Sequence, residues 1–270
     1  MNAHRRRKKR PLITLLTDFG TRDVYVGVMK GVIAGIAPQS MIIDLTHEVP
    51  PQDVVQASVL LHTAWPYFPR GSIHVVVVDP GVGTSRRALL VEADGHFFIG
   101  PDNGVFTPVF ENTPEHQVRS LEASRYALSR KSNTFHGRDV FAPAAAWLAQ
   151  GVPNEAFGPL IDDPIQLQWP RVKKTPDGWQ GEILGIDHFG NLITNLNRDE
   201  LTIRPDQQWS LSIADHLLDG KKTYGDAKRG ELLALVGGAG FIEVAVNGGS
   251  ARDVLGVGKG TPVHLHVSSD

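Results

Sequence analysis

The chain of 270 residues is 41% hydrophobic and 21% charged, which suits a globular protein with one large or two smaller domains. It has no cysteine, which excludes disulfides, thiolate metal sites and cysteine nucleophiles and fits the reducing cytoplasm, where we expect the protein. Without the six basic residues at 5–10, it carries 21 Lys and Arg against 29 Asp and Glu, a net charge of −8. This acidity argues against nucleic acid as a partner.

The N-terminal sequence MNAHRRRKKR is basic and is followed directly by PLITLLTDFG. A secretory signal would need a long apolar region and a small-residue cleavage site at this point, so none is predicted. No stretch approaches the roughly 18 uninterrupted apolar residues of a membrane span, and no membrane partner is expected. We expect residues 1–11 to form a disordered basic arm, with an anchor for nucleic acid or an anionic surface as the alternative.

Residues 12–165 alternate between strand and helix patterns. Strands are predicted at 12–17, 41–46, 73–78, 88–93 and 96–100, and helices at 24–38, at 53–68 and, after a loop, within 135–151. The strands are continuously apolar, which indicates a sheet buried on both faces, so we predict an α/β domain with a mostly parallel sheet. Ligands in such folds lie beyond the carboxyl ends of the strands, where Asp18, Asp44 and Asp79 fall.

The pattern changes after about residue 160. From residue 179 onward, short β-rich runs alternate with glycines and polar turns, at 181–186, 191–196, 209–214, 231–236, 241–246 and 262–267. Little helical periodicity remains in this part of the chain. We therefore predict a smaller all-β domain at 166–270, either a barrel or a sandwich.

The loop DPGVGTSRR at 79–87 follows the apolar run HVVVV. It matches neither the phosphate-binding GxxxxGK[ST] pattern nor a GxGxxG dinucleotide fingerprint, because no third glycine follows and ALLVEA reads as a strand. Its glycines permit a tight turn that could bring Asp79 and Arg86 together. The alternative is a surface salt bridge of little energetic value.

Two further stretches lie in the same domain. His136, in SNTFHGRD, precedes a predicted helix; it is either a structural residue or a site residue. Metal binding with Asp139 is disfavoured, because the stretch lacks the second histidine that zinc and iron sites generally use. In IGPDNGVFTPV, residues 102–104 form a strong turn signal, and Asn103 is the candidate site residue there.

Two stretches of the second domain combine polar groups. In IDHFGNLITN, Asp187 could bind an ammonium group and Asn191 a carboxylate or amine, or the stretch is an ordinary hairpin connection. In EVAVNGGSARDVLG, the backbone of the NGGS loop could read a purine edge, or the loop is only a turn. No GxSxG nucleophile motif is present.

Seven stretches together resemble one family. TDFGTRDVYVG, IIDLTHEVPPQDV, VVVVDPGVGTSRR, GPDNGVF, TFHGRDVFAP, IDHFGNLITN and VNGGSARDVLG resemble, over about residues 12–265, the S-adenosylmethionine (SAM) hydrolases, or SAM hydroxide adenosyltransferases. These are related to the SAM-dependent fluorinase and chlorinase. The resemblance implies an α/β domain followed by a β-barrel-like domain. It also implies a homotrimer that binds SAM between the N-terminal domain of one subunit and the C-terminal domain of its neighbour.

The resemblance also assigns roles to residues. Asp79, Arg86 and His136 match the catalytic set of the hydrolases. The residues expected to bind substrate are Asp18 at the ribose, Asp23, Tyr25, Asp187 and Asn191 at the methionine end, Val246, Asn247 and Gly248 at the adenine, and Asn103. No metal and no cofactor are expected, since SAM itself is the substrate.

Differences from the halogenases indicate the reaction. Halogenases carry tyrosine at the Asp79 position, and the fluorinase has tyrosine at His136, serine at Gly137 and an extra loop. Relatives often carry serine or asparagine near Gly238, so no side-chain contact with substrate is expected from that position. We expect hydrolysis of SAM to adenosine and L-methionine by water attacking the ribose 5′ carbon. The alternatives are a SAM or adenosine sensor with incidental turnover and, less favoured, a halogenase.

Overall fold

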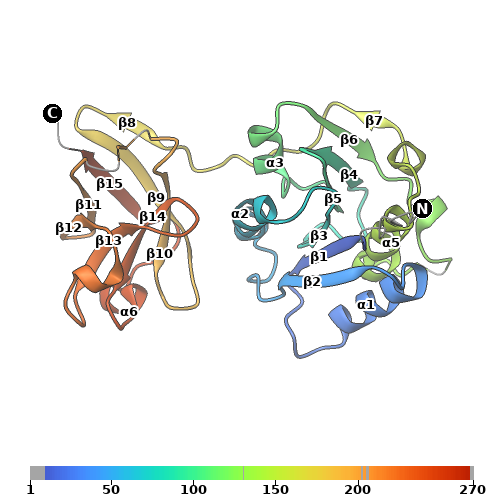
Figure 1. Ribbon diagram of the computed structural model, residues 1–270, viewed down its shortest axis with the longest axis horizontal. Coiled ribbons are helices and arrows are strands. Elements are labelled where there is room, and N and C mark those ends of the chain that lie inside the picture. Colours follow the sequence, from blue (N-terminus) through green and yellow to red (C-terminus); the bar gives the residue numbers. More distant parts are fainter. Residues whose placement is uncertain (1–9, 130, 202, 205–206, 268–270) are drawn as a thin grey trace, which may run out of the picture. The chain divides into compact units, whose positions relative to one another are not determined.

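The computed structural model describes residues 10–129, 131–201, 203–204 and 207–267, in two compact units, Met1–Leu167 and Gln168–Asp270 (Figure 1). The division falls two residues from the expected boundary between 165 and 166. Most of the expected basic arm lies outside the described residues. Pro11 belongs to the folded unit, because its carbonyl accepts a hydrogen bond from the Met41 N–H at 2.8 Å.

The first unit is built on a seven-stranded sheet in the order β2-β1-β3-β5-β4-β6-β7. Its strands are β1 (Leu12–Thr17), β2 (Met41–Thr46), β3 (Ile73–Val77), β4 (Ala88–Ala93), β5 (His96–Pro101), β6 (His116–Ser120) and β7 (Leu160–Ile161). The neighbours among β2, β1, β3 and β5 pair in parallel, whereas the other pairs are antiparallel. The α/β class is confirmed, and the sheet is mixed.

The antiparallel half begins at a tight hairpin between β4 and β5. Asp94 and Gly95 form its turn with φ angles of 47° and 72°, the left-handed pair that a two-residue hairpin requires. A turn this short cannot return the chain to a parallel register, because a parallel connection needs a crossover of a dozen or more residues.

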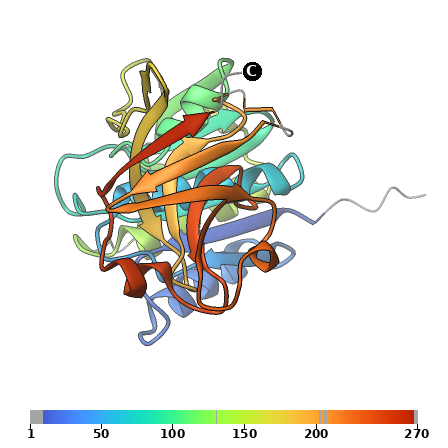
Figure 2. The ribbon, with the colours of Figure 1, turned by 90° about the vertical axis from the view of Figure 1, so that its left-hand side faces the viewer.

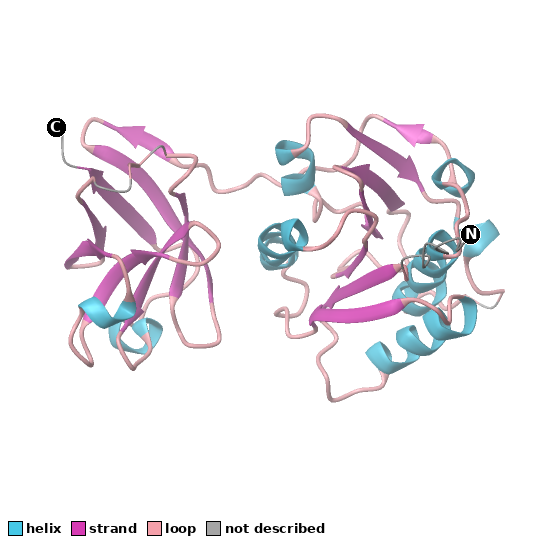
Figure 3. Ribbon diagram, viewed as in Figure 1, coloured by secondary structure: helices cyan, strands magenta, loops and turns pink. Residues whose placement is uncertain are grey.

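Helices cover both faces of this sheet, as predicted (Figures 1 and 3). One face carries α1 (Tyr25–Ile36) and α5 (Ala142–Ala149), and the other carries α2 (Val54–Ala64) and α3 (Thr107–Asn112). The remaining helical segments of the unit are η1 (Trp65–Tyr67), α4 (Ala123–Tyr126), the π-helix η2 (Gly137–Phe141) and η3 (Asn154–Phe157). Strand β3 shows the two-faced burial, since Val75 packs in the core with α1 and Val76 in the core with α2.

The second unit is a closed seven-stranded β-barrel, so the all-β prediction is confirmed (Figure 2). Its strands are β9 (Gly178–Ile186), β10 (Leu192–Asn197), β11 (Trp209–Ile213), β12 (His216–Lys221), β13 (Leu232–Val236), β14 (Phe241–Val246) and β15 (Pro262–Val267). The short β8 (Lys173–Thr175) pairs with β9, and η4 (Tyr224–Asp226) and α6 (Ala251–Leu255) lie in the connections. Pairing between β9 and β10 closes the barrel.

Alternate residues of the barrel strands fill its interior. Val263 and Leu265 of β15 are buried in the barrel core, while His264 between them is partly exposed. Within the described residues of both units, no helix combines the length and apolar character that crossing a bilayer would require.

Candidate active site

The first candidate residues stand on the loop that follows β3. The strand leaves the core at the buried Val78 and continues into Asp79. Gly83 has a φ of 81°, and a Cβ there would lie 2.6 Å from the Asn133 carbonyl oxygen. Only glycine therefore lets this loop approach the segment that carries His136 so closely.

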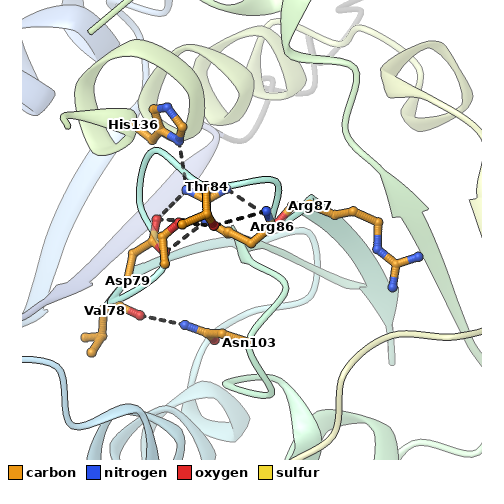
Figure 4. Close-up of polar contacts among 8 residues, drawn as sticks. Val78, Asp79, Thr84, Arg86, Arg87, Asn103 and His136 are labelled. Atoms are coloured by element: carbon orange, nitrogen blue, oxygen red, sulfur yellow. Dashed lines mark hydrogen bonds and ion pairs between the residues drawn. The ribbon is translucent and has the colours of Figure 1, made fainter. Parts of the chain in front are cut away.

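Arg86 contacts both Asp79 and His136 (Figure 4). The Arg86 Nε–H donates to Asp79 Oδ1 at 2.9 Å and to Oδ2 at 3.0 Å, and Nη2 also contacts Oδ2. The same Nη2 donates to His136 Nδ1 at 2.8 Å. The side chains of Asp79 and Arg86 are only 5% and 10% exposed, so this is a largely desolvated ion pair.

The contact with Arg86 determines which nitrogen of His136 carries the proton. Arginine has N–H donors and no acceptor, so Nδ1 of His136 accepts, and the neutral ring carries its proton on Nε2. Burial, followed by the charge of Arg86, lowers the pKa of His136 below its usual value, against a smaller opposing effect of Asp79. His136 is therefore a neutral imidazole with a hydrogen-bond donor at Nε2.

The second arginine of the loop has a different place. Arg87 extends away from Asp79 and His136 (Figure 4). Its Nε donates to Asp102 at 2.8 Å and its Nη1 to Asp163 at 2.6 Å. Arg87 thus holds the end of the first unit to the turn after β5.

Asn103, expected to bind substrate, contacts the strand end that leads to Asp79. Its Nδ2 donates to the Val78 carbonyl at 2.8 Å, and its Oδ1 accepts from the Val105 N–H at 3.2 Å (Figure 4). The Asn103 side chain therefore fixes the backbone immediately before Asp79.

The remaining candidates of the first unit lie around the start of α1. Asp18 is half-buried and accepts a hydrogen bond from the Gln52 N–H at 2.8 Å. Asp23 is exposed, and the Tyr25 ring lies 5.2 Å from Phe135, the neighbour of His136 in sequence. Tyr25 and the catalytic candidate His136 thus belong to adjoining segments of the same unit.

Asp44, which the sequence placed at a strand end with Asp18 and Asp79, lies inside β2 and is engaged in local ion pairs. Lys30 and His47 both contact its carboxylate, the latter at 3.1 Å through Nε2. His47 is 5% exposed and its Nδ1 lies 2.9 Å from the Thr17 hydroxyl oxygen, just before Asp18. Asp44 therefore belongs to the structural support of the strand ends and is separate from the Asp79–Arg86–His136 contacts.

In the second unit, Asp187 and Asn191 lie in one loop between β9 and β10. Asp187 Oδ1 accepts from the N–H groups of Phe189 at 2.9 Å and Asn191 at 2.8 Å, and Oδ2 accepts from Asn191 Nδ2 at 2.8 Å. These bonds pre-form the loop, because the carboxylate holds both the backbone and the amide of Asn191.

Two residues near this loop were not predicted from the sequence. Glu243 of β14 is 7% exposed, and the Tyr224 hydroxyl donates a hydrogen bond to it. Burial, with a further contribution from the charge of Asp187, raises the pKa of Glu243. A glutamate inside the apolar run FIEVAV was the available signal, since a buried carboxylate needs a partner.

The turn after β14 holds the last candidates. The Asn247 N–H donates to the Glu231 carbonyl at 3.1 Å, and its carbonyl accepts from the Gly230 N–H at 2.8 Å. Its side-chain Nδ2 donates to the Ala227 carbonyl at 2.8 Å, and Gly248 adopts a φ of 74°. Val246, Asn247 and Gly248 thus form a rigid turn, with both backbone groups of Asn247 already paired inside the unit.

Family models match both units. The SAM hydroxide adenosyltransferase N-terminal domain covers residues 13–158, and the C-terminal domain of the same family covers residues 181–264. The chain belongs to the SAM hydroxide adenosyltransferase family. The recognition from sequence is confirmed.

Three relatives indicate the place of the chain within the family. It is 42% identical to a protein from Thermus thermophilus named (R)-S-adenosyl-L-methionine hydrolase, over 94% of this chain and 98% of that protein. A crystal structure of an uncharacterized conserved protein from Thermotoga maritima superposes with a TM-score of 0.88 at 38% identity, covering 94% of this chain and 99% of that one. A fluorinase from Actinopolyspora mzabensis is more distant, at 26% identity over 71% of this chain and 73% of the fluorinase.

Proposed function

We propose that this protein hydrolyses SAM to adenosine and L-methionine by attack of water at the ribose 5′ carbon. The observation that carries the proposal is the contact of Arg86 with both Asp79 and His136, in a chain of this family. Curated relatives at 34–42% identity are named (R)-S-adenosyl-L-methionine hydrolases, which supports the (R) epimer at sulfur as the preferred substrate.

The chemistry requires little from the enzyme at the leaving group. SAM carries a sulfonium, so the sulfur takes the electron pair of the breaking C5′–S bond and departs as neutral methionine without acid catalysis. The enzyme must instead place a water oxygen in line with the 5′ carbon and favour loss of its proton. The new O–C5′ bond gives adenosine.

The three catalytic residues divide this task. Asp79 Oδ2 accepts from both Nε and Nη2 of Arg86, whereas Oδ1 accepts only from Nε among these contacts. Oδ1 therefore retains a lone pair with which Asp79 can orient the water and accept its proton. Arg86 supplies a fixed positive charge that stabilises developing hydroxide character. His136 donates from Nε2 to the water oxygen; it is not the proton acceptor, because Arg86 occupies the lone pair on Nδ1.

Substrate-binding roles follow the same assignment. We place the ribose hydroxyls at Asp18, the methionine end at Asp23, Tyr25, Asp187 and Asn191, and the adenine at the turn of Val246, Asn247 and Gly248. Asn103 acts by fixing the backbone beside Asp79. The reaction needs no metal and no cofactor in this scheme.

We further propose a homotrimer in which each site combines two subunits, acting in the cytoplasm. Large exposed apolar side chains beside candidate site residues support association: Val24 is 73% exposed next to Asp23, and Phe189 is 74% exposed in the Asp187 loop. Mixing the inactive variants Asp79→Asn and Asn191→Ala, after dissociation and reassembly, should restore activity if two chains build each site. Mixtures as inactive as the separate variants would contradict shared sites.

The reaction is tested by incubating the pure protein with SAM and EDTA in ¹⁸O-water. We expect ¹⁸O in the 5′-hydroxyl of adenosine, faster turnover of the (R) epimer, and a rate unaffected by chloride or fluoride. Label in methionine would contradict attack at the 5′ carbon, and a 5′-halogenated product would indicate a halogenase. Tight SAM binding without turnover would indicate a sensor.

A further inference from the structure

A cluster of two histidines and one aspartate lies on the outer face of the barrel. Val263 and Leu265 point into the core, so His264 and His266 share the opposite face of β15, with their side chains 31% and 32% exposed. Asp177 approaches them from the turn between β8 and β9. Its carboxylate and the two imidazoles present three ligand atoms that all lie within 4.8 Å of one another.

We propose that Asp177, His264 and His266 form a binding site for one divalent transition metal ion of the zinc class. His266 Nδ1 lies 3.1 Å from Asp177 Oδ2, and His264 Nε2 lies 3.5 Å from Asp177 Oδ1. Ligands bound to zinc at ~2.0–2.1 Å in a tetrahedron are about 3.3 Å apart. Each histidine lies near that distance from a different oxygen of Asp177, and one ligand atom from each of the three residues lies within 4.8 Å of the other two. Two imidazoles and a carboxylate suit zinc better than calcium or magnesium, and water completes the coordination.

The surroundings orient two of the three ligands. His266 Nε2 lies 2.8 Å from the Ser212 hydroxyl oxygen, and a hydroxyl can donate to or accept from that nitrogen. When His266 Nδ1 coordinates a metal, Nε2 carries the ring proton and donates a hydrogen bond to the Ser212 hydroxyl oxygen. The outer partners of metal-bound histidines act in the same way. Thr175 contacts His264 Nε2 at 2.9 Å, a hydrogen bond that the ion would replace.

The backbone holds the aspartate close to the strand. Gly178, the residue after Asp177, has a φ of 152°, and a Cβ there would lie 1.8 Å from the Leu265 carbonyl oxygen. The turn is thus pressed against β15 between the two histidines. A bound ion would cross-link the β8–β9 turn to β15 and needs no residue of the proposed catalytic set.

The test uses the full chain purified without a polyhistidine tag and stripped of metal with EDTA. Calorimetric titration with zinc chloride should give one saturable site, and cobalt chloride should give the visible absorption band of low-symmetry Co²⁺. Asp177→Asn and His266→Gln should each lower zinc affinity at least tenfold, and Ser212→Ala should weaken it while keeping all three ligands. His216→Gln, which removes an exposed histidine of β12, should leave zinc binding unchanged.

Circular dichroism in EDTA shows whether each variant is folded, and Asp177→Asn preserves the size of the side chain. No saturable zinc binding by the wild-type chain would overturn the proposal, as would equal binding by the wild type and folded Asp177→Asn and His266→Gln variants. In that case the cluster is a hydrogen-bonded brace for the hairpin. SAM hydrolysis, measured in parallel in EDTA, reports on the proposed catalytic function separately.

Discussion

A single nitrogen of Arg86, Nη2, contacts both the carboxylate of Asp79 and Nδ1 of His136. The guanidinium also stacks over Phe141, with Cζ 5.1 Å from the ring centroid. Its planar fork is thereby held in one orientation and joins two segments that are 50 residues apart in sequence. The predictions on catalysis follow from this arrangement.

Replacing Arg86 by lysine should lower kcat by about 100-fold or more while changing KM little. Lysine keeps the positive charge but cannot bridge Asp79 and His136 as the planar fork does, and loss of one fixed donor commonly costs 10²–10³ in rate. Arg87→Lys is the matched control in the same loop, because Arg87 contacts Asp102 and Asp163 instead. Steady-state kinetics of both variants would refute the assignment if the two lost activity equally.

The pH dependence should reflect the neutral state of His136. Because burial and then Arg86 lower its pKa, the ring stays neutral as pH falls through the usual histidine value of about 6.5. The value of kcat/KM should therefore hold down to pH 6.5 and decline only at lower pH. A profile that rises between pH 7 and 5.5 would show instead that the protonated imidazole is the active form.

The stability of the first unit should fall in acid because of a buried histidine pair in its sheet. His74 is fully buried, its Nε2 lies 3.2 Å from His96 Nδ1, and burial and then the neighbouring His96 lower its pKa to about 3. Between pH 6.5 and 3 the unfolded chain binds a proton there that the folded chain does not. The free energy of unfolding therefore decreases with falling pH, by about 1.4 kcal/mol per unit for one proton.

Urea titrations at pH 6.5, 5.5 and 4.5 would measure this effect. His74→Asn should be less stable than the wild type at pH 6.5, since Thr14 and His96 lose a partner, but its stability should decline less steeply toward pH 4.5. His216→Asn controls for the removal of a histidine from the surface. An identical slope in His74→Asn and wild type would remove His74 from the acid response.

The bounds of helices and strands were predicted best where a regular pattern of apolar residues extended over a whole element. Strands β1 and β2 have the predicted bounds, and α1 lies within the predicted helix. Strand β12, with the sequence HLLDGK and a single buried residue, has no such pattern and was missed. The π-helix at Gly137–Phe141 was expected as a loop, because nothing in FHGRDVF distinguishes an extra residue per turn from an irregular entry into α5.

The resemblance named Asp79, Arg86 and His136 as the catalytic set, and the structure shows Arg86 in contact with the other two. Only the fold shows that Arg86 donates to Nδ1 of His136, and our proposal of Asp79 as the proton acceptor rests on that contact. Glu243 and Tyr224 were missed because their pairing joins β14 to η4, two segments that only the folded unit brings together. The glutamate inside FIEVAV indicates that a buried partner is needed, but tertiary packing decides which residue of a distant segment that partner is.

Gly83 offers a test of how closely the catalytic loop must approach the His136 segment. Gly83→Ala places a Cβ both at a positive φ and 2.6 Å from the Asn133 carbonyl oxygen, so the loop must move away from that segment. Gly71→Ala is the matched control, since Gly71 has a similar φ of 89° but open space around its Cβ position. Both variants should lose about 1 kcal/mol of stability from backbone strain.

Only Gly83→Ala should also lose activity, by at least tenfold in kcat, because a shift of the loop breaks the hydrogen bond between Arg86 and His136. Chemical denaturation and steady-state kinetics measured on both variants separate strain from displacement. Full activity in a folded Gly83→Ala protein would mean that turnover tolerates loss of the Arg86–His136 contact, and His136 would then be a structural residue.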